Sequence, residues 1–292
     1  MFDSNRRATL YVVLLLIATV FVQPSGYAWS NGGYSSDPNS PAYGTHDFLA
    51  QHALDYVPLN MTNWLRENLN IYLYGTELPD NANAPLGDGI GDKAKHHAYY
   101  YASGQLQDDS EARRAKEAYQ QTLGSLAAKD YRTAAKWMGV TTHYVDDLGV
   151  FGHVMGVNTN WGNEVHHQDY EEWVNTKSNA YDASFKSCLS FDGNLEQTTA
   201  YDAALKLAHD TTFDDTGKGH TAKWMDANYN ESDPTFIARV CESLNGTVNL
   251  LADLVFSAGA TTNMAEFNAT LIFPTILVIL AMSLTIRRVK LT

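Results

Sequence analysis

The sequence predicts an all-α domain framed by two apolar ends, each of which carries basic residues. Three observations lead to this prediction. Apolar residues in the middle of the chain recur every three or four positions, which is the spacing of one face of a helix. No alternating stretch bounded by turn residues compels a strand. The 292 residues are 45% hydrophobic, which is enough for a substantial core and excludes wholesale disorder.

The first end, residues 1–28, has the order of a secretory signal peptide. Arg6 and Arg7 precede an apolar run at 10–22, and Ala28 closes a small-residue cleavage site. The run is short for a membrane span, so cleavage is favoured over the alternative of an uncleaved anchor helix. Cleavage leaves Trp29 as the N-terminus of an exported domain.

Between the ends, helical periodicity predicts nine helices. They cover residues 45–57, 64–73, 93–103, 110–126, 130–147, 164–177, 198–209, 221–228 and 235–256. Thr45 is a candidate N-cap of the first helix, and the helix at 130–147 has the best apolar stripe. The segment 75–92 contains Pro79 and Pro85 and forms a loop too long to be a simple connection.

The second end, residues 265–292, is predicted to be a C-terminal membrane anchor. An apolar run at 271–286 is followed by Arg287 and Arg288, as in a single span whose basic end is cytoplasmic. The tripeptide Ala265-Glu266-Phe267 before this run also resembles the sorting signals that archaeal sortase-like enzymes process. Those signals usually begin with proline, and this chain has alanine at that position. We therefore expect the domain at 29–264 on the extracellular face of the membrane, either anchored by this helix or released.

The overall charge and the cysteine count exclude several functions. The formal net charge is −13, so strong nucleic-acid binding through a basic face is not expected. Two cysteines are too few for a disulfide scaffold or a thiolate zinc module. Any metal must therefore be held by histidine and carboxylate, and export permits Cys188 and Cys241 to form a disulfide.

Histidines and carboxylates show the spacing of metal ligands. Eight of the ten histidines lie between positions 46 and 167. His143 and Asp147 are four residues apart, as are His167 and Glu171, and His153 lies between the two pairs. Residues four apart share one helix face and can offer zinc two ligands. A single pair of this kind usually lies on a solvated helix face or makes an ordinary hydrogen bond. Two pairs with a histidine between them favour a metal centre.

The ordered strings resemble the zinc-dependent phospholipase C family. They are Thr45-His46-Asp-Phe-Leu-Ala, Glu77-Leu-Pro-Asp80, Lys95-His96-His97-Ala-Tyr-Tyr, His143-Tyr-Val-Asp-Asp147, His153 and His167-Gln-Asp-Tyr-Glu171. The mature chain of that family begins with a tryptophan, as Trp29 would here. The resemblance covers residues 29–178 and leaves 179–264 as a C-terminal helical extension.

This resemblance implies a multi-helix bundle holding about three zinc ions, each bound by nitrogen and oxygen ligands. One ion would be bound by the α-amino nitrogen and carbonyl of Trp29 together with His46. Asp147 would bridge this ion to a second one. The second ion would also take Asp80, His97 and His143, and the third would take His153, His167 and Glu171.

Two choices within this ligand set remain open. Asp88 and Asp92 lie in the same loop as Asp80 and are alternatives to it. His96 and His166 each adjoin a favoured histidine, and neighbouring helical residues point about 100° apart, so only one of each pair faces the metals easily.

The resemblance implies hydrolysis of phosphate esters by metal-activated water, with a phospholipid or similar diester as substrate. Asp80 or Glu171 is the candidate general base. A single-strand nuclease or nucleotidase on the same fold is the alternative, but the long arm before His46 and the use of Glu171 favour the phospholipase branch. A third interpretation is a non-catalytic surface protein that zinc only stabilises.

Overall fold

The computed structural model describes residues 29, 33–178 and 184–289, with side chains up to residue 261. The predicted signal peptide, residues 1–28, lies outside the described residues. The side chains of the predicted C-terminal anchor, residues 265–292, also lie outside them. Among the described residues, no helix combines the length and apolar character that crossing a membrane requires.

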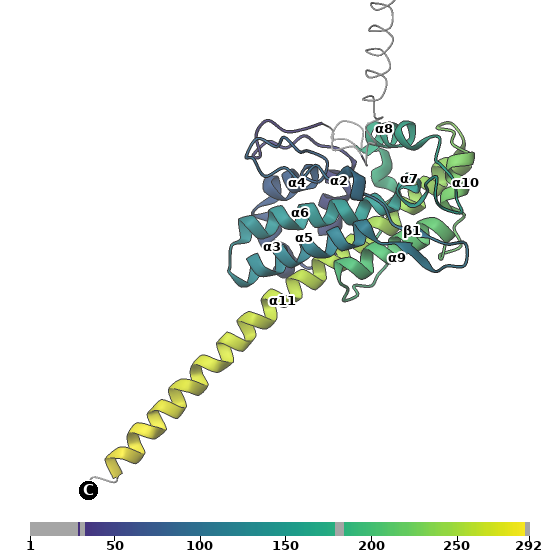
Figure 1. Ribbon diagram of the computed structural model, residues 1–292. Coiled ribbons are helices and arrows are strands. Elements are labelled where there is room, and N and C mark those ends of the chain that lie inside the picture. The colour runs from purple at the N-terminus through teal and green to yellow at the C-terminus, as the bar shows by residue number, and fades with distance from the viewer. Residues whose placement is uncertain (1–28, 30–32, 179–183, 290–292) are drawn as a thin grey trace, which may run out of the picture.

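The prediction of a mainly helical domain is confirmed (Figure 1). The α-helices are α2 (Thr45–Ala53), α3 (Leu59–Arg66), α4 (Leu69–Glu77), α5 (Ser110–Ala127), α6 (Tyr131–Asp146), α7 (Phe151–Val154), α8 (His167–Ser178), α9 (Ala200–Phe213), α10 (Ala222–Ala227) and α11 (Pro234–Val289). Short 3-10 turns are η1 (Leu54–Tyr56), η2 (Lys93–Lys95), η3 (Asp147–Gly149) and η4 (Ser184–Cys188).

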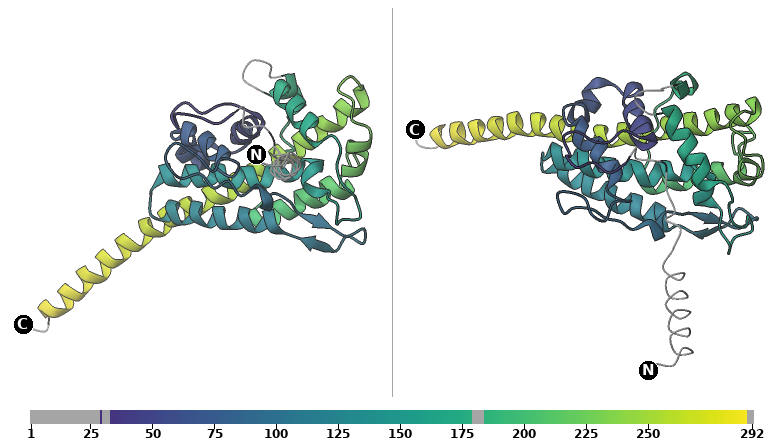
Figure 2. Two further views of the ribbon diagram at one scale, coloured as in Figure 1. Left: turned by 45° about the horizontal axis from the view of Figure 1, so that its top comes forward. Right: turned by 90° about the horizontal axis from the view of Figure 1, so that it is seen from above.

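Helix α6 lies at the centre of the bundle, between α5 and α4. Helix α11 runs behind this layer, where it contacts α2 and α3, and its C-terminal part projects from the body (Figures 1 and 2). Asp130 caps α6, because its carboxylate accepts from the backbone N–H of Thr133 at 3.1 Å. The last turn of this central helix carries His143, and Asp147 follows at its C-cap.

Two glycines bring α4 and α6 into close contact. A Cβ atom on Gly139 would overlap the carbonyl oxygen of Tyr72, and one on Gly75 would lie 3.0 Å from the Cα of Gly139. The backbones can approach this closely only because neither residue has a side chain. This contact places the C-terminal end of α4, with Thr76, beside His143.

The structure corrects two predicted helices. The helix predicted at 64–73 is divided into α3 and α4, which Asn68 separates. The helix predicted at 93–103 is wrong. Only η2 is helical there, and β1 (Tyr99–Tyr100) then pairs antiparallel with β2 (Leu106–Asp108). The predicted N-cap also moves by one position, because Thr45 is the first residue of α2 and Gly44 precedes it.

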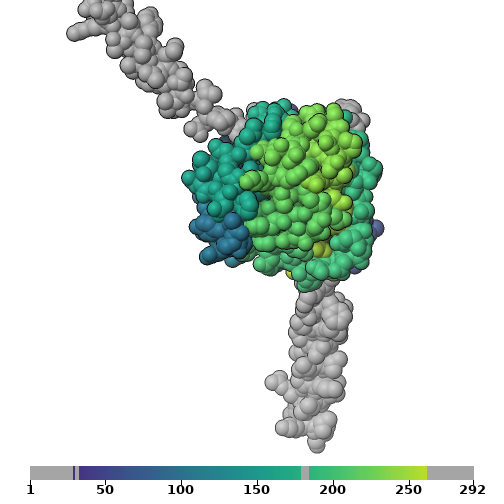
Figure 3. All heavy atoms as spheres, turned by 90° about the vertical axis from the view of Figure 1, so that its right-hand side faces the viewer, coloured from purple at the N-terminus to yellow at the C-terminus, as the bar shows by residue number. Residues whose placement is uncertain are grey.

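The chain after residue 183 packs onto the rest of the body. Helix α9 contacts α5 and α6, and residues of the C-terminal third cover the side of the molecule seen in Figure 3. The expected disulfide between Cys188 and Cys241 is present and joins η4 to α11, with the two Cα atoms 5.0 Å apart. The extension therefore completes the same bundle within the described residues.

Candidate metal centre

Histidine and carboxylate side chains from several elements converge inside the bundle. We call them the histidine–carboxylate cluster: His46, Asp80, His96, Glu111, His143, Asp146, Asp147, His153, His167 and Glu171. Helices α2, α5, α6, α7 and α8 contribute members, and so do the loops after α4 and η2. Nine of the ten residues are buried, and His167 is partly exposed.

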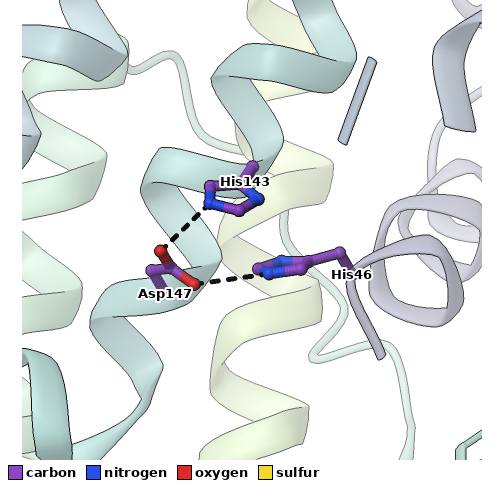
Figure 4. Close-up of side chains that lie close together, drawn as sticks. All are labelled: His46, His143 and Asp147. Atoms are coloured by element: carbon purple, nitrogen blue, oxygen red, sulfur yellow. Dashed lines mark ion pairs between the residues drawn. The ribbon is translucent and has the colours of Figure 1, made fainter. Parts of the chain in front are cut away.

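Asp147 lies at the middle of the cluster. Its Oδ1 is 3.4 Å from Nε2 of His46 and 3.9 Å from Nε2 of His153. Its Oδ2 is 3.2 Å from Nε2 of His143 and 3.1 Å from Nδ1 of His96. Figure 4 shows this carboxylate between His46 and His143, which stack with ring centroids 4.1 Å apart. One carboxylate thus faces imidazoles on both sides, which is the arrangement of a bridging ligand.

A second group of donors lies on the α8 side of Asp147. Oε1 of Glu171 is 2.7 Å from Nε2 of His167 and 3.4 Å from Nε2 of His153. Gly152 makes room for this group, since a Cβ atom there would overlap the ring of His167. His167 and Glu171, which are four residues apart in α8, therefore form the contacting pair that their spacing predicts.

Three of the histidines are oriented in the same way. Nδ1 of His143 donates to the carbonyl of Thr76, and Nδ1 of His153 donates to the carbonyl of His96, both at 2.7 Å. Nδ1 of His46 lies 2.7 Å from Asp146. In each ring Nε2 is left facing the cluster, with a lone pair available to a metal.

This cluster contains most of the buried polar side-chain atoms that have no hydrogen-bond partner among the described residues. They include Nε2 of His46 and His153, both oxygens of Asp147 and Glu111, and one oxygen of Glu171. Buried polar groups are normally satisfied, and leaving one without a partner costs about 1–3 kcal/mol. Imidazole nitrogens and carboxylate oxygens suit zinc, so the donor set fits bound divalent cations.

The carboxylates also perturb one another strongly. Burial lowers the pKa of His96, but hydrogen bonds to Asp147 and Asp92 outweigh it and raise this pKa to about 9. Burial raises the pKa of Asp146 and of Glu111 well above the usual range, and the charge of Asp147 adds to both shifts. These shifts favour the neutral acids, so the carboxylates can stay ionised out of water only if positive charge lies among them.

The structure places His96 in the cluster instead of His97, which the sequence analysis preferred. His97 stacks on Tyr99 and lies 3.5 Å from Asp108. The reason is that residues 96–98 are not helical. The backbone N–H of Ala98 donates to the carbonyl of His153, whose ring donates to the carbonyl of His96. His96 lies in a tight turn, in which the backbone N–H of His97 donates to the carbonyl of Lys95 at 2.9 Å, so the side chains of His96 and His97 point in different directions.

Asp80 is the member of its loop that reaches the cluster. Its Oδ1 is 3.5 Å from Nδ1 of His96 and 3.9 Å from Nε2 of His143. The two alternatives have other partners. Asp88 pairs with Lys136 at 2.8 Å, and Asp92 pairs with Arg114 at 2.6 Å. Asp92 still faces the outer nitrogen of His96 at 3.5 Å and so supports that ring from behind.

The indole of Trp29 is buried beside the cluster. Its Nε1 donates to the carbonyl of Asp146 at 2.9 Å, and its ring packs against Tyr170. This contact is one residue from Asp147. The preceding residue lies outside the described residues, so binding through the α-amino group stays a prediction.

Sequence reasoning missed two members of the cluster. Asp146, which holds His46, precedes Asp147 directly, and two adjacent acids at the end of the strongest helix were a usable signal. Glu111 gave no such signal, because an acid in the first turn of a helix is common on any surface. His52 and His209 are outside the cluster and pair with Asp55 and Asp215.

Comparisons with known proteins give structural matches alone. No family model matches the chain, and no curated protein matches it. The alpha toxin of Clostridium absonum is 15% identical with a TM-score of 0.49, and that of an avian strain of Clostridium perfringens is 14% identical with a TM-score of 0.46. Each match covers 78% of this chain and 65% of the toxin. These values are too low to carry a function, which rests on the residues of the cluster itself.

Proposed function

We propose that the chain is an exported zinc-dependent hydrolase of phosphate esters, of the phospholipase C type. The observation that carries the proposal is the orientation of His46, His143 and His153. Each ring is fixed through Nδ1, and its Nε2 lies 3.2–3.9 Å from a carboxylate oxygen of Asp147. Such outer hydrogen bonds set the tautomer and direction of metal-binding histidines.

The proposed ligands form three groups around Asp147. His46 and Asp147 face one position, to which the α-amino group of a mature Trp29 would add. Asp80, His96 and His143 face a second position on the other side of Asp147. The third position lies between His153, His167 and Glu171.

Bound zinc supplies a polarised phosphoryl oxygen, a water of lowered pKa and neutralisation of the leaving alkoxide. The chain's own residues hold the ligands rigid and keep bulk water out, because nearly every member of the cluster is buried. The side chain of His167 is 16% exposed, so the third position lies nearest to solvent. There the free Oε2 of Glu171 can accept a proton from an attacking water.

Phospholipid is the proposed substrate class, and the C-terminal segment 265–292 would keep the enzyme at a membrane surface. The net charge of −13 disfavours long polyanions such as single-stranded DNA. The enclosure of the cluster gives weight to a second candidate, a metal centre that only stabilises the fold.

One experiment separates these functions. The exported full-length chain is purified with zinc and incubated in parallel with phosphatidylcholine vesicles and with single-stranded DNA. Release of diacylglycerol that stops on chelation supports the proposal, and release of mononucleotides alone supports a nuclease. If chelation lowers the melting temperature while both assays stay blank, the centre is structural.

A further inference from the structure

The ligand groups of the proposed function leave out two carboxylates of the cluster: Asp146, which contacts Nδ1 of His46, and Glu111. Glu111 is the second residue of α5, and its backbone N–H donates to the carbonyl of His97 at 3.1 Å. Its side chain lies within 4.8 Å of donor atoms of both His96 and Asp147, and its Oε2 is 4.0 Å from Nδ1 of His153. Helix α5 therefore adds a carboxylate to the cluster.

The position of Glu111 in the first helical turn does not explain its burial. An acid there interacts favourably with the helix dipole, and it does so while exposed to water. Glu111 is 0% exposed, and neither carboxylate oxygen has a hydrogen-bond partner among the described residues. Burying an ionised carboxylate without a partner destabilises the fold by more than the interaction with the helix dipole stabilises it.

The neighbours of Glu111 already face other groups: Nδ1 of His96 lies 3.1 Å from Asp147, and its Nε2 lies 3.5 Å from Asp92. Asp147 is itself a carboxylate, and Nδ1 of His153 already donates to the carbonyl of His96. Only two arrangements satisfy the group: either Glu111 is ionised and binds a cation, or it is neutral and donates its proton to Asp147. Geometry favours the first arrangement, because ligand atoms of Glu111, His96 and Asp147 lie within 4.8 Å of one another, as around a single ion.

We propose that Glu111 is a metal ligand, whose carboxylate joins His96 and Asp147 in holding one divalent cation. This inference rests on the proposed function, because it adds a ligand to the same centre. Five carboxylates then face about three divalent cations, so that negative and positive charges nearly balance in the buried site. An imidazole and two carboxylates are ligands that zinc accepts.

The test is the substitution Glu111→Gln in the full-length chain loaded with zinc. Metal content is measured by plasma mass spectrometry after dialysis against a graded series of chelator concentrations. We expect the weakest-held zinc to be lost at a chelator concentration at least ~10-fold lower than in the wild type. The zinc-induced rise in melting temperature should also be smaller in this variant.

This substitution distinguishes the two arrangements. A glutamine amide can donate a hydrogen bond to Asp147 as a neutral acid does, so metal retention equal to the wild type overturns the proposal. Glu77→Gln is the control, since Glu77 is also 0% exposed but accepts hydrogen bonds from Ser35. It should keep the full metal content, even if its melting temperature falls.

A variant that fails to fold does not end the test. In that case Glu111→Asp is measured, because it keeps the charge but withdraws the carboxylate by one carbon–carbon bond. Weaker zinc retention than the wild type is expected, and equal retention overturns the inference. Failure of the proposed function looks different: the wild type itself would then retain no zinc, or would retain zinc without hydrolysing either substrate.

Discussion

Nδ1 of His96 lies 3.1 Å from Oδ2 of Asp147, whereas the next residue, His97, faces Asp108 on the other side of its segment. The two adjacent histidines thus form a matched pair for mutation. We expect His96→Ala to lower hydrolysis by a factor of ~10² or more and to weaken zinc retention, because a ligand is removed. His97→Ala should leave both within about twofold, since it removes a partly exposed ring that stacks on Tyr99 outside the cluster. Metal content and initial rates check this prediction, and equal effects of the two substitutions would contradict it.

A second matched pair lies on α8. Glu171 contacts His153 and His167 and is 1% exposed, whereas the adjacent Glu172 is exposed and bonds to Gln168. Glu171→Gln should lower the turnover rate by at least ~10², because the amide can neither bind metal well nor accept a proton from water. Glu172→Gln should be neutral in the same assay. Full activity of the Glu171 variant would remove this residue from the centre.

The sequence predicts the helical class and most of the cluster, because both depend on local spacing. His143 and Asp147, like His167 and Glu171, are four residues apart on one helix, and helix geometry alone brings them together. The choice between His96 and His97 required the path of residues 96–98. One backbone hydrogen bond, from Ala98 to the carbonyl of His153, and one from the ring of His153 to the carbonyl of His96 fix that path, and His153 is distant in the sequence. Glu111 could not be found for the same reason, since its burial depends on how α5 packs against the cluster.

The residue at the mature N-terminus gives a third prediction. The indole of Trp29 is held by the carbonyl of Asp146, which places this residue next to Asp147. If its free amine binds metal, one extra residue before Trp29 should displace one of about three zinc ions, because an amide nitrogen is a poor ligand. Circular dichroism should show the helices intact. An extended chain that keeps its full zinc content would exclude the amine as a ligand.

The disulfide gives a fourth prediction, which concerns stability. Cys188 and Cys241 are 53 residues apart in the sequence, so their bond restricts a long loop of the unfolded chain. Replacing both with serine should lower the free energy of unfolding by about 2–4 kcal/mol. Metal content at 25 °C should stay unchanged, because neither cysteine belongs to the histidine–carboxylate cluster. Urea denaturation measures the first quantity. An unchanged midpoint would show that packing of η4 on α11 suffices without the bond.

The close contact of α4 with α6 links the stability of the bundle to the geometry of the centre. Gly139→Ala forces a methyl group onto the carbonyl oxygen of Tyr72 and pushes α4 away, which should cost about 1–3 kcal/mol or more. The same shift moves the carbonyl of Thr76, which accepts the Nδ1 proton of His143 at 2.7 Å. We therefore expect zinc retention to weaken together with stability, although Gly139 has no side chain that could bind metal. Gly124→Ala is the control, because a Cβ atom on this helical glycine of α5 meets no described atom within 4 Å. That variant should be neutral or more stable by up to about 1 kcal/mol, with metal retention unchanged.

Thermal melts with and without chelator measure both effects. If the Gly139 variant is destabilised by the same amount in the two conditions, the contact between α4 and α6 does not position His143.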